Sequence, residues 1–160
     1  MKNKLLTLAY LTALVSGSAM AATYGPTTPA TASVTIAENG TITGTITTTP
    51  HFPGIIGDNQ MMGRVELVTK TGGPTAITWD PASCNGGVTV SGQGRSPACS
   101  IIGGPGKLSL LLWGGQNGFS QNGEQYAHAA GGGYNILTVG SNTLVAGKYP
   151  IHLLAAEYAA

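Results

Sequence analysis

Ala30-Thr31-Ala32-Ser33-Val34-Thr35-Ile36, near the start of the chain, alternates two kinds of side chain. Small or apolar residues take the even-numbered positions, and hydroxyl residues take the odd-numbered ones. Because successive side chains of a β-strand point to opposite faces, this period of two predicts a strand with one apolar face and one polar face. The alternating segment begins at Thr27 and lies ahead of the bulk of the domain.

A second alternating run follows closely. Glu38-Asn39-Gly40 interrupts the pattern, and Thr41-Ile42-Thr43-Gly44-Thr45-Ile46-Thr47 resumes it. Asn-Gly between two alternating runs is typical of a β-hairpin. Two interpretations of the first run therefore stay open. Either it folds back on its own domain as an N-terminal hairpin, or it leaves the domain and completes another molecule.

The first residues have the pattern of a secretory signal peptide. Lysines open the chain, Leu5–Val15 is an apolar run too short to span a bilayer, and Ala19-Met20-Ala21 is a small-residue cleavage site. We expect export, removal of Met1–Ala21, and a mature chain that begins near Ala22.

The composition is poor in charge and rich in glycine. Of 160 residues, 8 % are charged and 25 are glycine, whereas about 25 % of the residues in ordinary soluble domains are charged. Without Lys2 and Lys4, the seven basic residues fall to five, against six acidic ones. A nucleic acid or an anionic membrane needs clustered Lys and Arg, so we expect neither as a partner.

The mature chain contains two cysteines, Cys84 and Cys99. In the oxidising compartment that an exported protein reaches, such a pair predicts a disulfide. The bond would close a loop of about 15 residues and stabilise the fold by roughly 3 kcal/mol. The pair has neither the C-x-x-C spacing of a redox site nor the ligand spacing of a zinc site.

The rest of the chain predicts an all-β sandwich. Short apolar or alternating runs are separated by Gly/Pro/Asn-rich turns, with loops expected at 51–59 and 114–123, and no window of ten or more mature residues keeps a period of 3.6. We expect strands over Arg64–Thr69, Ala76–Trp79, Val88–Val90, Lys107–Trp113, Gln125–Ala129, Tyr134–Val139 and Tyr149–Tyr158.

The last of these strands is apolar on both faces. Its odd positions carry Tyr149, Ile151, Leu153 and Ala155, and its even positions carry His152, Leu154, Ala156 and Tyr158. No further strand follows it to pair with. We therefore expect an open edge beside this strand.

Motifs of catalysis and metal binding fail on their spacing. Gly103–Lys107 lacks the first glycine and the Ser or Thr of a phosphate-binding loop, and Ser120 lacks the second glycine of a nucleophile elbow. No acid and nucleophile lie beside the three histidines in sequence, which are His51, His128 and His152. The sequence positions of the six carboxylates do not indicate a glycosidase pair. We expect no enzyme, no cofactor and no metal.

Three segments occur along the chain in an order that is similar to that of a known protein family. An alternating leader that ends in Ala32-Ser33-Val34-Thr35-Ile36-Ala37 follows the signal peptide, Gly63-Arg64-Val65-Glu66-Leu67 supplies an early strand, and Leu144-Val145-Ala146-Gly147-Lys148-Tyr149 opens a last strand with Tyr158 near its end. This set resembles the chaperone–usher pilins, in particular the Saf/Sef-type fimbrial major subunits, and does so most specifically at the two ends of the chain.

The resemblance implies an incomplete immunoglobulin-like β-sandwich that lacks its last strand and carries an N-terminal donor-strand extension. The corresponding divisions are a signal peptide at 1–21, the extension at 22–37 and the pilin domain at 38–160. An open sandwich exposes an apolar groove and unpaired backbone groups. In such pilins a periplasmic chaperone covers the groove, and at the outer-membrane usher the leader of the next subunit replaces it by β-strand addition.

The function that this implies is a fimbrial subunit on the cell surface, polymerised with copies of itself and supporting adhesion to host surfaces. The donor strand would present Ala30, Ala32, Val34 and Ile36 to the neighbour's groove. The acceptor edge would comprise Tyr149, Ile151, Leu153, Leu154 and Tyr158. Whether Leu153 or Leu154 lines the groove is left open.

A second interpretation is a tip adhesin or a secreted monomeric β-sandwich that binds carbohydrate. Trp113, Tyr126 and Tyr134 are aromatic candidates for a shallow glycan site, although core packing is the commoner role for such residues. Neither interpretation identifies the host glycan or protein that would act as receptor.

Overall fold

The computed structural model describes residues 4–13, 31–35, 42–49, 51–92, 94–121, 123–129, 131–147 and 149–159. Apart from one short 3₁₀ turn at Pro81–Ser83 (η1), the regular elements in these ranges are strands. They are β1 (Lys4–Ala13), β2 (Thr31–Thr35), β3 (Ile42–Thr48), β4 (Gly54–Ile56), β5 (Met61–Thr69), β6 (Thr75–Trp79), β7 (Thr89–Val90), β8 (Pro97–Ser100), β9 (Ser109–Trp113), β10 (Phe119–Gln121), β11 (Glu124–Ala129), β12 (Gly133–Thr138), β13 (Asn142–Leu144) and β14 (Ile151–Ala159).

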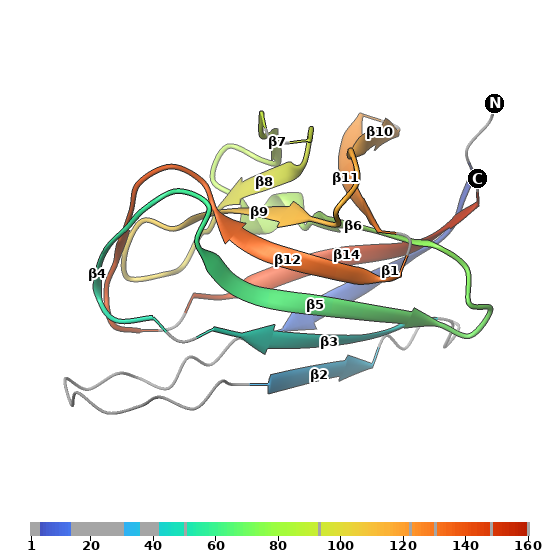
Figure 1. Cartoon of the computed structure of the whole chain (residues 1–160), viewed down its shortest axis with the longest axis horizontal. Helices are drawn as coiled ribbons and strands as arrows, with labels where there is room; N and C mark the ends of the chain where they lie inside the picture. Colours follow the sequence, from blue (N-terminus) through green and yellow to red (C-terminus); the bar gives the residue numbers. More distant parts are fainter. Residues whose placement is uncertain are drawn as a thin grey trace.

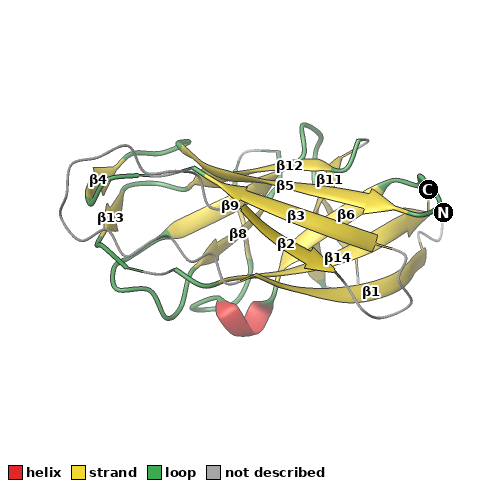
Figure 2. Ribbon diagram, turned by 90° about the horizontal axis from the view of Figure 1, so that it is seen from below, coloured by secondary structure: helices red, strands yellow, loops and turns green. Residues whose placement is uncertain are grey.

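The strands form three antiparallel sheets. A five-stranded sheet has the order β1-β14-β6-β11-β10, a seven-stranded sheet has the order β2-β3-β5-β12-β9-β8-β7, and β13 pairs with β4 in a small third sheet. Figures 1 and 2 show the two larger sheets as layers that face each other. The expectation of an all-β fold is confirmed, and the arrangement is consistent with a β-sandwich.

The core lies between the two larger sheets because alternation directs one face of each strand inward. In β5, Gly63, Val65 and Leu67 are buried while the residues between them are exposed. The largest fully buried side chains come from both sheets, and they include Ile46, Val65, Leu110, Leu112, Tyr134 and Ile136 from one and Ile77, Trp79 and Leu153 from the other.

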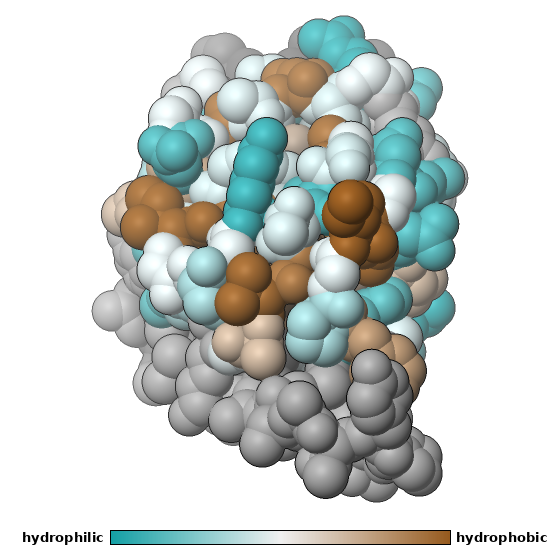
Figure 3. Space-filling view, turned by 90° about the vertical axis from the view of Figure 1, so that its left-hand side faces the viewer, coloured by the Kyte–Doolittle hydropathy of each residue, from teal (hydrophilic) through white to brown (hydrophobic). Residues whose placement is uncertain are grey.

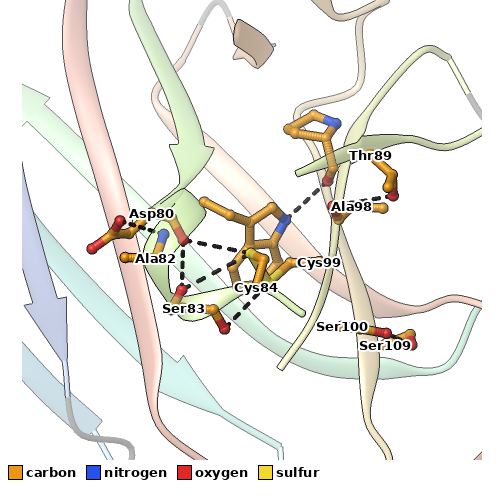
Figure 4. The surroundings of a disulfide bond; sticks show 11 residues. Asp80, Ala82, Ser83, Cys84, Thr89, Ala98, Cys99, Ser100 and Ser109 are labelled. Atoms are coloured by element: carbon orange, nitrogen blue, oxygen red, sulfur yellow. Dashed lines mark hydrogen bonds between the residues drawn. A yellow bond between two sulfur atoms is a disulfide. The ribbon is translucent and has the colours of Figure 1, made fainter. Parts of the chain in front are cut away.

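The predicted disulfide is present between Cys84, just after η1, and Cys99, in β8. It closes a loop with a sequence separation of 15 residues. It links the segment that follows β6, a strand of the five-stranded sheet, to β8 in the seven-stranded sheet. The buried Trp79 lies in the same core cluster and donates a hydrogen bond from its indole nitrogen to the Pro97 carbonyl, 3.0 Å away. Figure 4 shows this region, where the Asp80 carboxylate accepts from the Ala82 backbone N–H and begins η1.

Several strands lie where the sequence predicts loops or no element. Strand β4 falls inside the expected loop at 51–59, and β10 falls inside the expected loop at 114–123. Strands β8 and β13 are likewise additions to the expected set. Each has four residues or fewer and no extended alternation, so pairing with a neighbouring strand, rather than its own pattern, makes it a strand.

Candidate functional site

Strand β14 carries the predicted acceptor edge, and it lies between two partners. On one side it pairs with β6, where Leu153 is opposite Trp79 and Ala155 is opposite Ile77. On the other side it pairs with β1 over nearly its whole length, and both ladders are antiparallel. Figure 2 shows β1 running along β14 at the margin of the molecule.

The two faces of β14 have different surroundings, which decides a question that the sequence left open. Ile151, Leu153 and Ala155 belong to the core cluster shared by the two large sheets. Leu154 and Ala156 are also buried but lie at alternate positions, outside that cluster. Of the two candidates for the groove wall, Leu153 is therefore the one that faces the core.

Strand β1 is the element that covers the outer edge of β14. It is the end strand of its sheet, and within the described ranges it is the one strand paired with that edge. Yet residues 4–13 coincide with the part of the chain that the sequence assigns to a removable signal peptide. A chain without them would leave the backbone groups of this edge unpaired, which is costly unless another strand takes the position.

The ladder between β1 and β14 specifies what such a strand must offer. The residues of β14 that face the core are paired with small residues and one larger one, namely Ala13 with Ile151, Leu11 with Leu153 and Ala9 with Ala155. The edge therefore accepts an antiparallel strand with an apolar residue at every second position.

The predicted donor strand lies elsewhere in this structure. Strand β2 pairs antiparallel with β3, so that Ala32 is opposite Ile46 and Val34 is opposite Gly44. This is the arrangement expected of the N-terminal hairpin on the chain's own domain. Strand β2 is the end strand of the seven-stranded sheet. Ala30 and Ile36, the two outer residues of the predicted donor set, lie outside the described residues.

Tyr149 occupies the corner that leads into β14. Its hydroxyl accepts a hydrogen bond from the Val145 backbone N–H at 2.9 Å and donates one to the Val145 carbonyl at 3.1 Å. Its ring lies against Gly104, where a Cβ atom would overlap the ring carbons, and its hydroxyl lies 2.8 Å from the Cβ position of Gly106. Tyr149 therefore fixes the corner before the strand. Tyr158, at the other end, is paired through its backbone with Leu5.

The aromatic residues proposed for a glycan site are largely internal. Tyr134 is fully buried, and its hydroxyl donates to the Thr75 carbonyl at 2.6 Å. Burial raises the pKa of Tyr134 to about 12. Tyr126 is also buried, and its hydroxyl donates to the Glu124 carboxylate at 2.6 Å. Burial, and after it the hydrogen bond and charge of Glu124, raise the pKa of Tyr126 well above the usual range. Trp113 is half-buried against the small cluster of Ala98, Leu111 and Leu137.

A cavity of about 280 Å³ lies near the disulfide, lined by residues that include Trp79, Pro81, Val90, Glu124 and Gln125. Its one carboxylate, Glu124, is the group that accepts from Tyr126. Across the described part of the chain, no three His, Cys, Asp or Glu side chains lie close enough together to hold a metal ion. No helix in these ranges has the length and apolar character needed to cross a membrane.

Comparisons with protein-family models, with curated proteins and with solved structures give no match to this chain. The outer edge of β14, which is paired with β1, is the structural feature on which the proposed function rests.

Proposed function

We propose that the mature protein is a structural subunit of a bacterial fimbria, assembled by the chaperone–usher pathway through donor-strand exchange and supporting adhesion. The observation that carries the proposal is the pairing of β14 with residues 4–13, which the sequence assigns to a signal peptide. After cleavage, the position of β1 would need a new strand. In the proposed cycle a periplasmic chaperone fills it first, and the leader of another copy fills it at the outer-membrane usher.

The geometry around β14 supports an immunoglobulin-like sandwich that is incomplete in this sense. A tyrosine at the start of a strand whose hydroxyl bonds to the backbone a few residues upstream is a feature of immunoglobulin-like domains, and Tyr149 bonds to Val145 in this way. A buried tryptophan packed beside a disulfide is another, and Trp79 lies in one cluster with Cys84 and Cys99. The disulfide joins Cys84, in the segment that follows β6 and η1, to β8.

The leader has the pattern that the edge of β14 accepts. Its apolar residues recur at every second position, as those of β1 do where they are paired with the core-facing residues of β14. Ala32 opposite Ala155 and Val34 opposite Leu153 repeat the small and the larger residue of β1 at these positions, whereas Ile36 would lie opposite Ile151, where β1 has the smaller Ala13. The proposed register pairs Ala32 with Ala155, Val34 with Leu153 and Ile36 with Ile151.

Exchange requires the leader to leave β3, and the cross-strand partners favour this step. On β3, the residue opposite Val34 is Gly44, which offers no side chain. On β14 the partner would be Leu153, and directly opposed apolar side chains stabilise a sheet by roughly 0.2–1 kcal/mol per pair. The ladder hydrogen bonds lost on β3 are replaced on β14. Burial of Val34 and Ile36 in the groove would contribute about 1.5–3 kcal/mol each.

A pair of cysteine variants tests the proposal. In Thr35→Cys with His152→Cys, the proposed register places the two cysteines opposite each other on different subunits. We expect multimers joined by disulfides, seen as a ladder on a non-reducing gel after co-expression with the chaperone and usher.

The matched control keeps the same leader cysteine. Thr35 is opposite Thr43 in the observed hairpin, so Thr35→Cys with Thr43→Cys should form a bond within one subunit and hold the leader on β3. We expect this variant to remain monomeric. A cross-linked hairpin in the control, with no ladder from the first variant, would contradict the proposal.

The second candidate, a monomeric carbohydrate-binding β-sandwich or tip adhesin, is favoured by one observation. The leader lies on its own domain through the ladder between β2 and β3. That arrangement suits a protein that keeps its leader, and the same pair of variants distinguishes the two candidates.

A further inference from the structure

We propose that the end of the molecule where β14 begins is a docking face for the body of a second copy of this chain. The inference rests on the proposed function and extends it: beyond lending a strand, the neighbouring subunit packs against this end. Exposed side chains, the direction of the added strand and the length of the connecting segment each point to it.

Exposed apolar side chains gather at this end. Among the residues whose side chains the structure describes, seven large apolar ones are exposed, and four belong to the segments around β4, β13 and the loop after β8. We call this set the apolar end: Phe52, Ile55, Ile102 and Val145. Ile55, on β4, is 83 % exposed. Figure 3 views the molecule from this end and shows apolar side chains set among pale and hydrophilic ones.

The backbone pairing joins these segments. Strand β4 pairs with β13, where Ile55 is opposite Thr143, and Thr143 also forms a bridge with Lys107 in the loop after β8. In the same loop, the Cβ position of Gly103 lies 3.3 Å from Pro150, directly before β14. The apolar end therefore surrounds the start of β14.

The direction of β1 shows where an added strand leaves the sheet. Because the ladder is antiparallel, the last residue of β1, Ala13, is paired with Ile151, the first residue of β14. A donor strand in the proposed register runs the same way, with its Ile36 at Ile151. The donor's chain therefore emerges beside the apolar end.

The connecting segment is too short to hold the donor's body away from this end. Five residues lie between Ile36 and Ile42, where β3 begins, so the two are six Cα–Cα steps apart. Even fully extended, six steps span at most about 22 Å. The end of the second copy at which its β3 begins must therefore lie close to the apolar end of the first.

That opposing end also carries an exposed apolar side chain. Thr43, the second residue of β3, is opposite Val68 on β5, and Val68 is 64 % exposed. The contact would join two different ends of identical molecules. Such a head-to-tail contact continues into a fibre because it does not close on itself.

The function of this contact would be to stiffen the fibre. A donated strand followed by a short linker alone would leave neighbouring subunits free to swing, whereas apolar packing at the joint would hold them in one orientation.

The experiment measures fibre stiffness in multimers of the full chain locked by the Thr35→Cys and His152→Cys pair. Ile55→Asp and Phe52→Asp place a charge on exposed positions of the apolar end, and Val68→Asp does so on the opposing end. We expect each to form the disulfide ladder at the level of the parent cysteine pair, while the persistence length on electron micrographs falls at least about twofold.

Val90→Asp is the matched control, because Val90 is 55 % exposed but lies on β7, away from both ends. We expect this variant to keep the persistence length of the parent cysteine pair. An intact ladder with unchanged stiffness in the Ile55, Phe52 and Val68 variants would overturn the docking face and leave the strand exchange standing. No ladder in the parent pair would overturn both.

Discussion

At the scale of single residues, Leu153 and Leu154 show that strand pairing gives information that the hydrophobic pattern of β14 does not. Leu153 and Leu154 are equally apolar, and a strand that is apolar on both faces gives no sign of which face points inward. The pairing with β6 settles it, because Leu153 is opposite Trp79, a residue of the central cluster. In the proposed exchange, the residue that a donor strand would meet is therefore Leu153.

The first prediction concerns Val34→Asp in the leader. In the proposed register its carboxylate would be buried without a partner opposite Leu153, which costs roughly 2 kcal/mol or more. We expect multimer yield to fall at least about tenfold, as measured by quantitative gel analysis of fibres sheared from cells. Ser33→Asp, on the polar face of the leader, is the control and should assemble normally. Equal yields from the two variants would count against the register.

A second prediction follows from Tyr134. Its pKa is raised to about 12 in the folded protein because the hydroxyl is buried, whereas an unfolded tyrosine titrates near about 10. The unfolded state therefore loses its proton first, and the free energy of unfolding should decrease as pH rises from about 10 to 12. Below pH 10 the contribution is fully present.

Urea unfolding at a series of pH values checks this, with Tyr134→Phe as the comparison. We expect the variant to be less stable at neutral pH, because Thr75 loses its partner, and to show a shallower decline above pH 10. Parallel curves for the two proteins would show that Tyr134 is not the group responsible.

At the scale of elements, the sequence predicts those strands whose pattern is long enough to read. The alternation over Thr41–Thr47 predicts β3, and Arg64–Thr69 predicts most of β5. The short strands β4, β8, β10 and β13 have too few residues to show a period, so their sequences look like loops. The ladder between β1 and β14 is not predictable either, because an apolar run next to a cleavage site is typical of a signal peptide.

The acceptor edge stays a prediction, and the sequence anticipates only the strand that would carry it. The sequence does not say which face of β14 is inward, what pairs with its outer edge, or that Tyr149 fixes the corner before it. Those facts depend on contacts between residues far apart in the chain. The disulfide was predictable because the mature chain contains only Cys84 and Cys99.

The third prediction concerns that disulfide. Replacing both Cys84 and Cys99 with serine removes the link between the segment after η1 and β8. We expect a loss of about 3 kcal/mol in the free energy of unfolding, measured by urea titration of the mature protein. A loss below about 1 kcal/mol would mean that the hydrogen bond from Trp79 to Pro97 and the surrounding packing already hold the two segments together.

At the scale of the whole molecule, the proposed function requires a sandwich with one exchangeable position. The outer edge of β14 holds β1 here, and the leader lies on β3 at the margin of the other sheet. The fourth prediction is that loss of the signal peptide frees the first position and drives the leader of one copy into another. A donated strand paired along its length leaves slowly, so the multimers should survive detergent at room temperature.

The most direct measurement is the molecular mass, by light scattering, of the chain beginning at Ala22 after release from a co-expressed periplasmic chaperone. We predict multimers at integer multiples of the subunit mass, which persist in unheated detergent and collapse to one band on boiling. A monodisperse monomer that stays folded for days without a capping protein would contradict the account.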